Sequence, residues 1–355
     1  MIRRAAYVVL MMLVLVMCLA GRVVAQGVWE VAHVDGVEYV KLSDVWRFYR
    51  FAPCKGRAGC VSYGAGKHVV SIKPEKSDFY VNNYRYVLSN PVRRVSDELM
   101  ISAVDVRKLV DPVLRPRYSP KAKLKTVVID PGHGGHDAGA VSGNVKEKDL
   151  NLAVANKLRK MLERQGYRVV MTRDGDYFLT LQERVDIANQ VPDSVFVSIH
   201  HNSGRKAASG IETFTLAPYG TTSPFARSRR FDDLAGNNQD SENIALATAV
   251  HSRAILNSGA VDRGIQRARF SVLCTIKRPA ILFEGGFVSN SEECGKMVTD
   301  SYQYLLADSI TKGIVAYNNS VCKPGRADVA TTGSVSGRVR TSISGSRVNR
   351  YSQKK

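Results

Sequence analysis

Cysteine, long apolar runs and acidic residues are all scarce in this sequence. Each shortage argues against one kind of site, membrane segment or binding partner. Six cysteines occur without any Cys-x-x-Cys spacing, so the sequence does not support a zinc site built on cysteines. The longest apolar run, Ala5 to Ala20, is shorter than the roughly 20 residues of a membrane-spanning helix. Acidic residues number 32 against 51 basic ones, and the resulting net charge of +19 favours association with polyanions.

The N-terminal stretch has the three parts of a secretory signal. Two arginines precede the apolar run, and a series of small residues ending at Ala25 follows it. We therefore expect residues 1–25 to be a signal peptide that is cleaved after Ala25. The alternatives are a retained membrane anchor and a lipoprotein signal at Cys18, although Met17 stands where such signals have a small residue.

Five cysteines remain in an exported chain, and this odd number leaves at least one thiol unpaired within the molecule. Cys54 and Cys60 flank a short loop of Lys, Gly and Arg, and they are spaced to close a hairpin disulfide. The pairing of Cys274, Cys294 and Cys322 stays open.

Residues 28–118 have the pattern of a small α+β domain. Its expected elements are strands at 36–40 and 67–72, a hairpin at 79–88 with Asn82-Asn83 at the turn, and short helices at 42–45 and 102–106. Prolines among basic residues follow, and we interpret residues 119–124 as a linker.

Residues 125–320 alternate strand and helix patterns. Strands are expected at 127–129, 168–172, 194–199, 211–216 and 280–283, and helices from 147 to Gly166 and at 181–190, 243–256 and 301–317. This order predicts an α/β fold, a mostly parallel twisted sheet with helices on both faces. The small α+β domain precedes it.

Polar residues that bind metals stand at the ends of three predicted strands. His133 follows the first strand, His200 follows the strand at 194–199, and Glu284 follows the strand at 280–283. The carboxyl ends of parallel strands share one edge of the sheet, and Glu147 begins a helix nearby. A lone histidine there is usually a hydrogen-bonded polar residue. Two histidines and a carboxylate together form a common catalytic zinc set, beside which a second carboxylate acts as general base.

Four motifs in this part resemble those of a known family: IDPGHGG, KEKDLNLA, VSIHHNS and LFEGGFVSN. In kind and order they are similar to the zinc-dependent N-acetylmuramoyl-L-alanine amidases, which hydrolyse the amide between the lactyl group of muramic acid and the first L-alanine of the peptidoglycan stem. The resemblance covers about residues 125–317. It implies Zn²⁺ held by His133, Glu147 and His200, with Glu284 as the catalytic glutamate.

One position departs from the family pattern. His201 stands where relatives often have a small residue. A substrate contact and competition for the metal are open, but we favour either a place behind the ligands or an exposed position. Two other functions also remain open for the chain, a zinc peptidase acting within the stem peptide and a wall-binding protein with an inactive site.

Residues 28–118 weakly resemble the copper amine oxidase N-terminal-like domain, without a copper site, and a spacer and a wall-binding role are both open.

An exported protein meets only the binding partners that are present in the cell envelope or outside the cell. Removing the three arginines of the signal lowers the net charge from +19 to +16, and the polyanions of a bacterial envelope are anionic lipid, wall polymer and stem-peptide carboxylates. We therefore expect peptidoglycan as substrate, no nucleic acid, and a periplasmic location, with a secreted or wall-associated one as the alternative. An activating or divisome protein is a further expected partner.

Two polar segments, residues 217–240 and 323–355, have no strand or helix pattern. Residues 217–240 are interpreted as a substrate-contacting loop, with an autoinhibitory lid and a solvated surface loop as alternatives. Residues 323–355 hold eight basic residues against Asp328, a charge of +7, among Ser, Thr and Gly. We expect this tail to be disordered, and either to hold the enzyme near an anionic wall or membrane surface or only to aid solubility.

Overall fold

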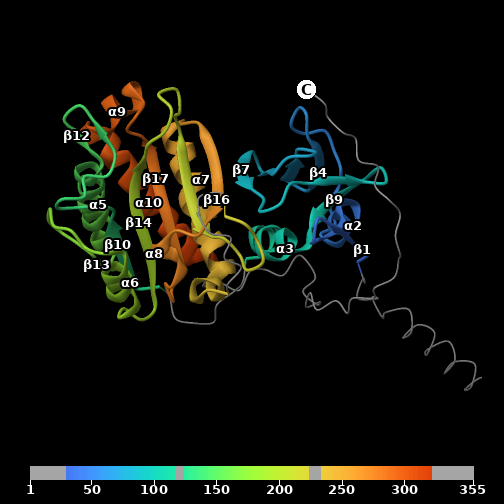
Figure 1. Ribbon diagram of the computed structural model, residues 1–355, viewed down its shortest axis with the longest axis horizontal. Coiled ribbons are helices and arrows are strands. Elements are labelled where there is room, and N and C mark those ends of the chain that lie inside the picture. Colours follow the sequence, from blue (N-terminus) through green and yellow to red (C-terminus); the bar gives the residue numbers. More distant parts are fainter. Residues whose placement is uncertain (1–28, 117–123, 224–232, 322–355) are drawn as a thin grey trace, which may run out of the picture.

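The computed structural model describes residues 29–116, 124–223 and 233–321 (Figure 1). The predicted signal peptide, the predicted tail and most of the predicted linker lie outside these ranges, so they stay predictions. Among the described residues, no helix combines the length and the apolar character needed to cross a membrane.

The N-terminal part is a small α+β unit. Its strands are β1 (Val31–Val34), β2 (Val37–Lys41), β3 (Ala52–Pro53), β4 (Val61–Ala65), β5 (His68–Ile72), β6 (Asp78–Val81), β7 (Tyr84–Val87), β8 (Arg93–Val95) and β9 (Glu98–Ser102). Its helices are α2 (Leu42–Phe48), α3 (Ala103–Asp105), the π-helical η1 (Val106–Val110) and α4 (Asp111–Leu114). The predicted hairpin is confirmed, because β6 pairs with β7 and both turn residues, Asn82 and Asn83, have positive φ. The thiols of Cys54 and Cys60 are free, so the expected disulfide is not formed.

The second part contains β10 (Thr126–Pro131), β11 (Val141–Ser142), β12 (Val145–Lys146), β13 (Arg168–Met171), β14 (Ser194–Asn202), β15 (Ile211–Leu216), β16 (Asp262–Ala268) and β17 (Ala280–Phe287). Its helices are α5 (Glu147–Arg164), α6 (Leu181–Asn189), the 3₁₀ helix η2 (Ala235–Gln239), α7 (Asp240–Ser258), α8 (Ser271–Cys274), α9 (Ser291–Met297) and α10 (Asp300–Val321). The predicted helices and strands of this part are all present. Strand β16 was not predicted from the sequence.

Helices cover both faces of the sheet, which confirms the predicted α/β fold. One apolar cluster packs α5, α7 and α10 on the first face through residues such as Leu158, Val250 and Ile310. The second cluster packs α6 and α8 on the opposite face against Phe196 and Phe214. Strands β13, β10, β14 and β17 are parallel, so their carboxyl ends share one edge, whereas β15 runs antiparallel to β17.

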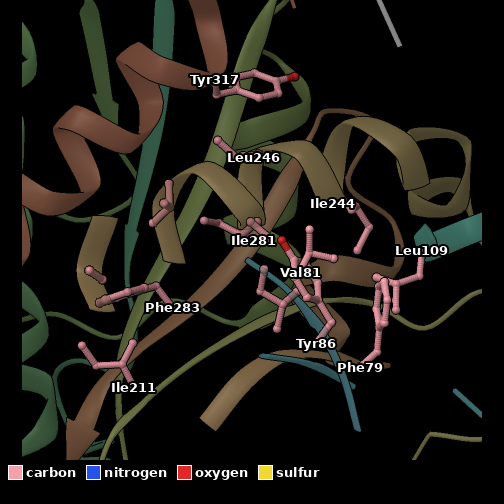
Figure 2. Close-up of a cluster of buried hydrophobic side chains, with 14 of the residues drawn as sticks. Phe79, Val81, Tyr86, Leu109, Ile211, Ile244, Leu246, Ile281, Phe283 and Tyr317 are labelled. Carbon is pink, nitrogen blue, oxygen red and sulfur yellow. The ribbon is translucent and has the colours of Figure 1, made fainter. Parts of the chain in front are cut away.

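The sheet continues from the second part into the first. Its order is β13-β10-β14-β17-β15-β16-β7-β6-β5-β4-β3, and Ile265 of β16 is the register partner of Tyr86 of β7. Figure 2 shows Phe79 and Tyr86 of the N-terminal part beside Ile244 of α7, and one buried cluster includes residues of both parts. The two parts therefore share one apolar core.

Candidate metal centre and catalytic glutamate

The segment after β10 holds His133 in a conformation that the surrounding backbone fixes. The φ of His133 is +61°, in the left-handed region. A Cβ on Gly132 would lie 2.1 Å from Cε1 of His200, so only glycine lets this segment approach the second histidine. Two buried guanidinium groups brace it, because Arg184 donates to the carbonyl of His133 at 2.7 Å and Arg173 donates to that of Gly132 at 2.8 Å.

Three of the predicted site residues form one cluster. His133, Glu147 and His200 each offer one ligand atom, and these atoms all lie within 4.8 Å of one another. Nε2 of His133 lies 3.2 Å from Oε2 of Glu147, and Nδ1 of His200 lies 2.9 Å from Oε1 of the same carboxylate. Glu147 begins α5, so its side chain is fixed at the start of a long helix.

The two imidazoles and the carboxylate shift one another's proton affinity. Burial raises the pKa of Glu147, but the hydrogen bonds from His133 and His200 outweigh it and bring that pKa well below its usual range. Burial lowers the pKa of His133, but the bonds to Glu147 and Asp137 outweigh it and raise that pKa. A bound cation would replace the protons that these atoms share in its absence.

A second layer of hydrogen bonds orients the cluster. Nδ1 of His133 lies 2.8 Å from Oδ2 of Asp137, which leaves Nε2 to face Glu147. Nδ2 of Asn151 donates to Oε1 of Glu147 at 3.3 Å, and the amide of Ala140 donates to Oε2 at 2.9 Å. Such partners fix the ring orientation of metal-binding histidines, so the donor set fits a zinc ion.

His201 lies behind this cluster. It is buried, its Nδ1 lies 2.8 Å from Oδ1 of Asn151, and its amide donates to Oε1 of Glu147 at 3.2 Å. Burial lowers the pKa of His201 to about 4, so the ring is neutral near pH 7. It is not among the three clustered ligands, and of the open roles the structure favours a place behind them.

Glu284 lies beside the cluster on β17, where it is the register partner of His200. The side chain is buried, and its Oε2 has no hydrogen-bond partner among the described residues. Burial, followed by the charges of Glu147 and Glu212, raises the pKa of Glu284 well above its usual value. An unpartnered buried carboxylate oxygen next to three metal-binding atoms is what a site for a cation and water requires.

An arginine partner for Glu284 would have explained its burial without any catalytic role. Arg173 donates instead to the carbonyls of Pro131 and Gly132, and Arg184 donates to Asp130. Both guanidinium groups are thus engaged with the segment that carries His133. The purely structural explanation for Glu284 finds no support in these contacts.

Asp137 and Asn151 were not among the site residues predicted from the sequence. Asn151 follows Glu147 by four residues in α5, a spacing that places both on one helix face and was available as a signal. Asp137 had no comparable signal, because its approach to His133 depends on the turn in which Gly134 and Asp137 form an isolated β-bridge.

Only residues 217–223 and 233–240 of the predicted substrate-contacting loop are described, and they lie away from the candidate site. Because Glu212 is the register partner of Glu284 and Phe214 that of Leu282, β15 runs away from the site and ends at the opposite edge of the sheet. The described parts of the segment, 217–223 and 233–240, start and finish there, as Asn237 donating to the carbonyl of Ala217 illustrates. The prediction of a substrate contact is wrong for these parts.

Known proteins match the part of the chain that holds the site. Residues 127–316, more than half of the chain, match the family described as N-acetylmuramoyl-L-alanine amidase. The uncharacterized protein YqiI of Bacillus subtilis is 38% identical over 193 residues, which cover 54% of this chain and 84% of that protein. The amidase AmiC of Escherichia coli O6:H1 is 33% identical over 242 residues, 60% of this chain and 58% of that protein.

Two further proteins illustrate the extent of the similarity. The amidase LytC of Bacillus subtilis is 33% identical over 194 residues, 54% of this chain and 35% of that protein. A solved N-acetylmuramoyl-L-alanine amidase structure from Clostridium difficile 630 has 36% identity and a TM-score of 0.48, covering 56% of this chain and 99% of that chain. Because the family match covers more than half of the chain, and its range includes His133, Glu147, His200 and Glu284, the chain belongs to the N-acetylmuramoyl-L-alanine amidase family, enzymes that act on peptidoglycan.

Proposed function

We propose that this chain is a zinc-dependent amidase that cleaves the bond between N-acetylmuramic acid and L-alanine of the stem peptide. His133, Glu147 and His200 would hold the ion, and Glu284 would be the general base. The observation that carries the proposal is the cluster of three ligand atoms within 4.8 Å, with the unpartnered Oε2 of Glu284 buried beside it.

In the proposed reaction, some side chains orient the metal ligands and Glu284 transfers the proton. When bound, zinc supplies Lewis acidity at the scissile carbonyl and lowers the pKa of an adjacent water. Asp137 and Asn151 keep the ligand side chains in place. Glu284 accepts the proton of the attacking water and returns it to the nitrogen of the leaving L-alanine, so the products are a free lactyl carboxylate and a free amine. The positive charge of a bound cation would lower the pKa of Glu284, so the carboxylate would stay ionised and able to accept that proton.

Metal content and activity, measured on the same preparations, test these roles. We expect one zinc per chain, loss of zinc and activity in His133→Ala and His200→Ala, and no change in the control His33→Ala, an exposed histidine of the N-terminal part. Glu284→Gln should retain zinc while losing about 10²–10⁴-fold in rate, the usual effect of removing a general base. Full zinc occupancy in both histidine variants would exclude the proposed ligands, and normal turnover by zinc-loaded Glu284→Gln would exclude the base.

Product analysis separates this function from its alternatives. Digestion of purified sacculi by an amidase releases stem peptides with a free L-alanine amino group and leaves intact sugar strands. A zinc peptidase would instead release fragments cut between stem amino acids, and an inactive wall-binding protein would release nothing. Mass spectrometry of the soluble products distinguishes the three.

The same proposal includes export into the cell envelope, where the substrate is. It rests on the sequence pattern of residues 1–25 and on the family's substrate, and it specifies the periplasm, with a secreted or wall-associated enzyme as the alternative. N-terminal sequencing of the mature protein from cell fractions tests it, and a chain that begins before Ala25 in the envelope fraction would contradict cleavage at that site.

A further inference from the structure

Two exposed flanks of different chemistry border the candidate site. The carboxyl edge that carries His133, His200 and Glu284 also carries the segments that follow β13 and β14. In Figure 1 this is the end of the sheet near β12 and α9. Neither segment contributes a proposed ligand or the proposed base, so both are free to contact the rest of a large substrate.

The segment after β13 is the aromatic flank, which we define as His136, Tyr177 and Phe178. The side chains of Tyr177 and Phe178 are 44% and 40% exposed, which is unusual for aromatic residues next to a buried centre. The ring of Phe178 lies over that of His136, with 4.2 Å between their centroids. His136 belongs to the same turn as His133, so the flank directly adjoins the metal-binding cluster.

Hydrogen bonds and close backbone contacts hold the aromatic flank in position. Asp176 accepts from the amide of Gly135 at 2.8 Å and from the ammonium of Lys148 at 2.6 Å. A Cβ on Gly134 would lie 2.3 Å from the carbonyl oxygen of Tyr177, so the two segments are in direct backbone contact. An exposed aromatic surface that is held rigidly loses little side-chain entropy when it binds a ligand.

The segment after β14 is the basic flank, which we define as Arg205 and Lys206. Because β17 lies between β14 and β15, this connection crosses the end of the strand that carries Glu284. Ser289 and Asn290 anchor it, since Gly204 donates to Oγ of Ser289 at 2.9 Å and Asn290 donates to the carbonyl of Lys206 at 3.1 Å. Both cations are exposed, and neither is joined to a carboxylate among the described residues.

The substrate of this family has the matching polarity. The scissile amide joins a sugar, whose C–H faces pack well on aromatic rings, to a peptide that carries carboxylates. A substrate with this amide at the cluster therefore extends in opposite directions. We propose that the glycan binds the aromatic flank and that the stem-peptide carboxylates bind the basic flank, an inference that rests on the proposed function.

Steady-state kinetics on four soluble substrates tests this arrangement. The substrates are a muropeptide with free stem carboxylates, the same compound with those carboxylates amidated, and a lactoyl peptide without the sugar in both forms. The variants are Tyr177→Ala/Phe178→Ala and Arg205→Ala/Lys206→Ala, each prepared with zinc and checked for metal content. The matched controls lie at the other edge of the sheet: Tyr219→Ala, which replaces a residue that is 58% exposed, and Lys160→Ala/Arg164→Ala near the end of α5.

Each flank should respond to one chemical group only. We expect the aromatic variant to raise KM about tenfold for the sugar-bearing substrates and to leave the lactoyl peptides unchanged. The basic variant should raise KM about tenfold for substrates with free carboxylates and leave the amidated ones unchanged. In both variants kcat should stay within about twofold, because neither flank touches the reacting atoms.

The outcomes separate this inference from the proposed function. If the wild-type enzyme cleaves these substrates but each variant behaves like its control, or loses activity on all four alike, the assignment of the flanks is overturned. If the aromatic variant is sensitive to the stem carboxylates and the basic variant to the sugar, the substrate binds in the reverse direction and the inference is equally wrong. Failure of the wild-type, zinc-loaded enzyme to cleave any of them would overturn the proposed function instead.

Discussion

The guanidinium of Arg184 is a buried cation that donates to Asp130, to the carbonyl of Pro131 and to that of His133, and so supports the segment carrying His133. It lies 2.8 Å from Oδ1 of Asp130, and the two side chains are 3% and 1% exposed. Thr172 and Ser198 also donate to Asp130, at 2.7 and 2.8 Å, so the carboxylate is fully hydrogen-bonded. These contacts connect the ends of three adjacent strands beneath the candidate site.

Removing either partner of the Arg184–Asp130 ion pair should strongly reduce the stability of the fold. We expect Arg184→Leu to lower the free energy of unfolding by about 3–5 kcal/mol, because it leaves the charge of Asp130 buried without its counter-ion. Urea denaturation followed by circular dichroism measures this. The control Arg159→Leu breaks a surface pair with Glu163 whose side chains are 44% and 45% exposed, and it should cost about 0–1 kcal/mol. Equal costs for the two variants would contradict the role given to Arg184.

The buried carboxyl of Glu284 gives the metal-free protein a specific pH dependence. Because its pKa in the folded chain is raised above the unfolded value, its contribution to stability is fully present below the unfolded pKa near 4.5 and is lost as pH rises through the folded pKa. Glu284→Gln removes this loss. We therefore expect the chelator-treated variant to be more stable than chelator-treated wild type, with a difference that grows from about pH 4.5 upwards. Melting curves across pH test this, and a variant that is less stable at neutral pH would contradict it.

The sequence was enough to predict that the candidate ligands and the candidate base lie at one edge of the sheet, but not which side chains hold them in place. His133, His200 and Glu284 were predictable because each follows an apolar strand, and parallel strands bring such positions to one edge. The bracing of the site by Arg173 and the burial of His201 were not predictable. Both depend on side-chain distances across segments that are far apart in the chain.

At the scale of elements, the junction between β7 and β16 is the feature that the sequence concealed. The sequence of β16, DRGIQRA, carries charges and only one large apolar residue, so it lacks the pattern of a buried strand. Its partner β7 belongs to the other half of the chain. Arg85 of β7 donates its amide to Asp262 at 2.8 Å and its side chain to the carbonyl of Arg263 at 2.6 Å. A contact that spans about half of the sequence gives no local signal.

The location of residues 217–223 and 233–240 was hidden from the sequence for a related reason. The expected sheet was mostly parallel, and nothing in the sequence singled out β15 as a strand that runs the other way. The antiparallel pairing of β15 with β17 sends these described residues to the other edge, and the alternation of apolar residues in a strand is the same in both directions.

Tyr86 tests whether the junction stabilises both parts of the chain. Its side chain is 1% exposed, and its hydroxyl donates to Oγ1 of Thr248 in α7 at 3.3 Å. We expect Tyr86→Ala to lower the stability by about 3–5 kcal/mol, as for other large aromatic residues removed from cores. Tyr80→Ala, a half-buried neighbour in the same hairpin, is the control and should cost clearly less. A Tyr86→Ala protein that melts like the wild type would show that the two parts are stable independently.

At the scale of the whole molecule, the excess of basic residues is the dominant property. The predicted tail, residues 323–355, contributes +7 to the total of +19 and lies outside the described residues. Deleting it should leave the turnover of a soluble muropeptide unchanged and weaken binding to insoluble wall at low salt, because surface electrostatic attraction is screened as ionic strength rises.

Pelleting assays with purified sacculi at several salt concentrations measure this binding. A control in which the eight basic residues of the tail are replaced by serine separates the effect of charge from that of length. Equal wall binding of the deletion variant and the full chain at low salt would assign the tail no role in adsorption.

If the N-terminal part binds the wall, one of the two roles that stay open for it, the sheet shared by the two parts would also restrict where the enzyme cuts. With β7 paired to β16 and one core beneath both, the N-terminal part cannot swing relative to Glu284 as a domain on a flexible tether does. A wall strand held by the N-terminal part would therefore present its stem peptides at a constant offset from the catalytic centre. The spacing of the wall polymer, and not the reach of a linker, would then determine the positions at which the enzyme cleaves.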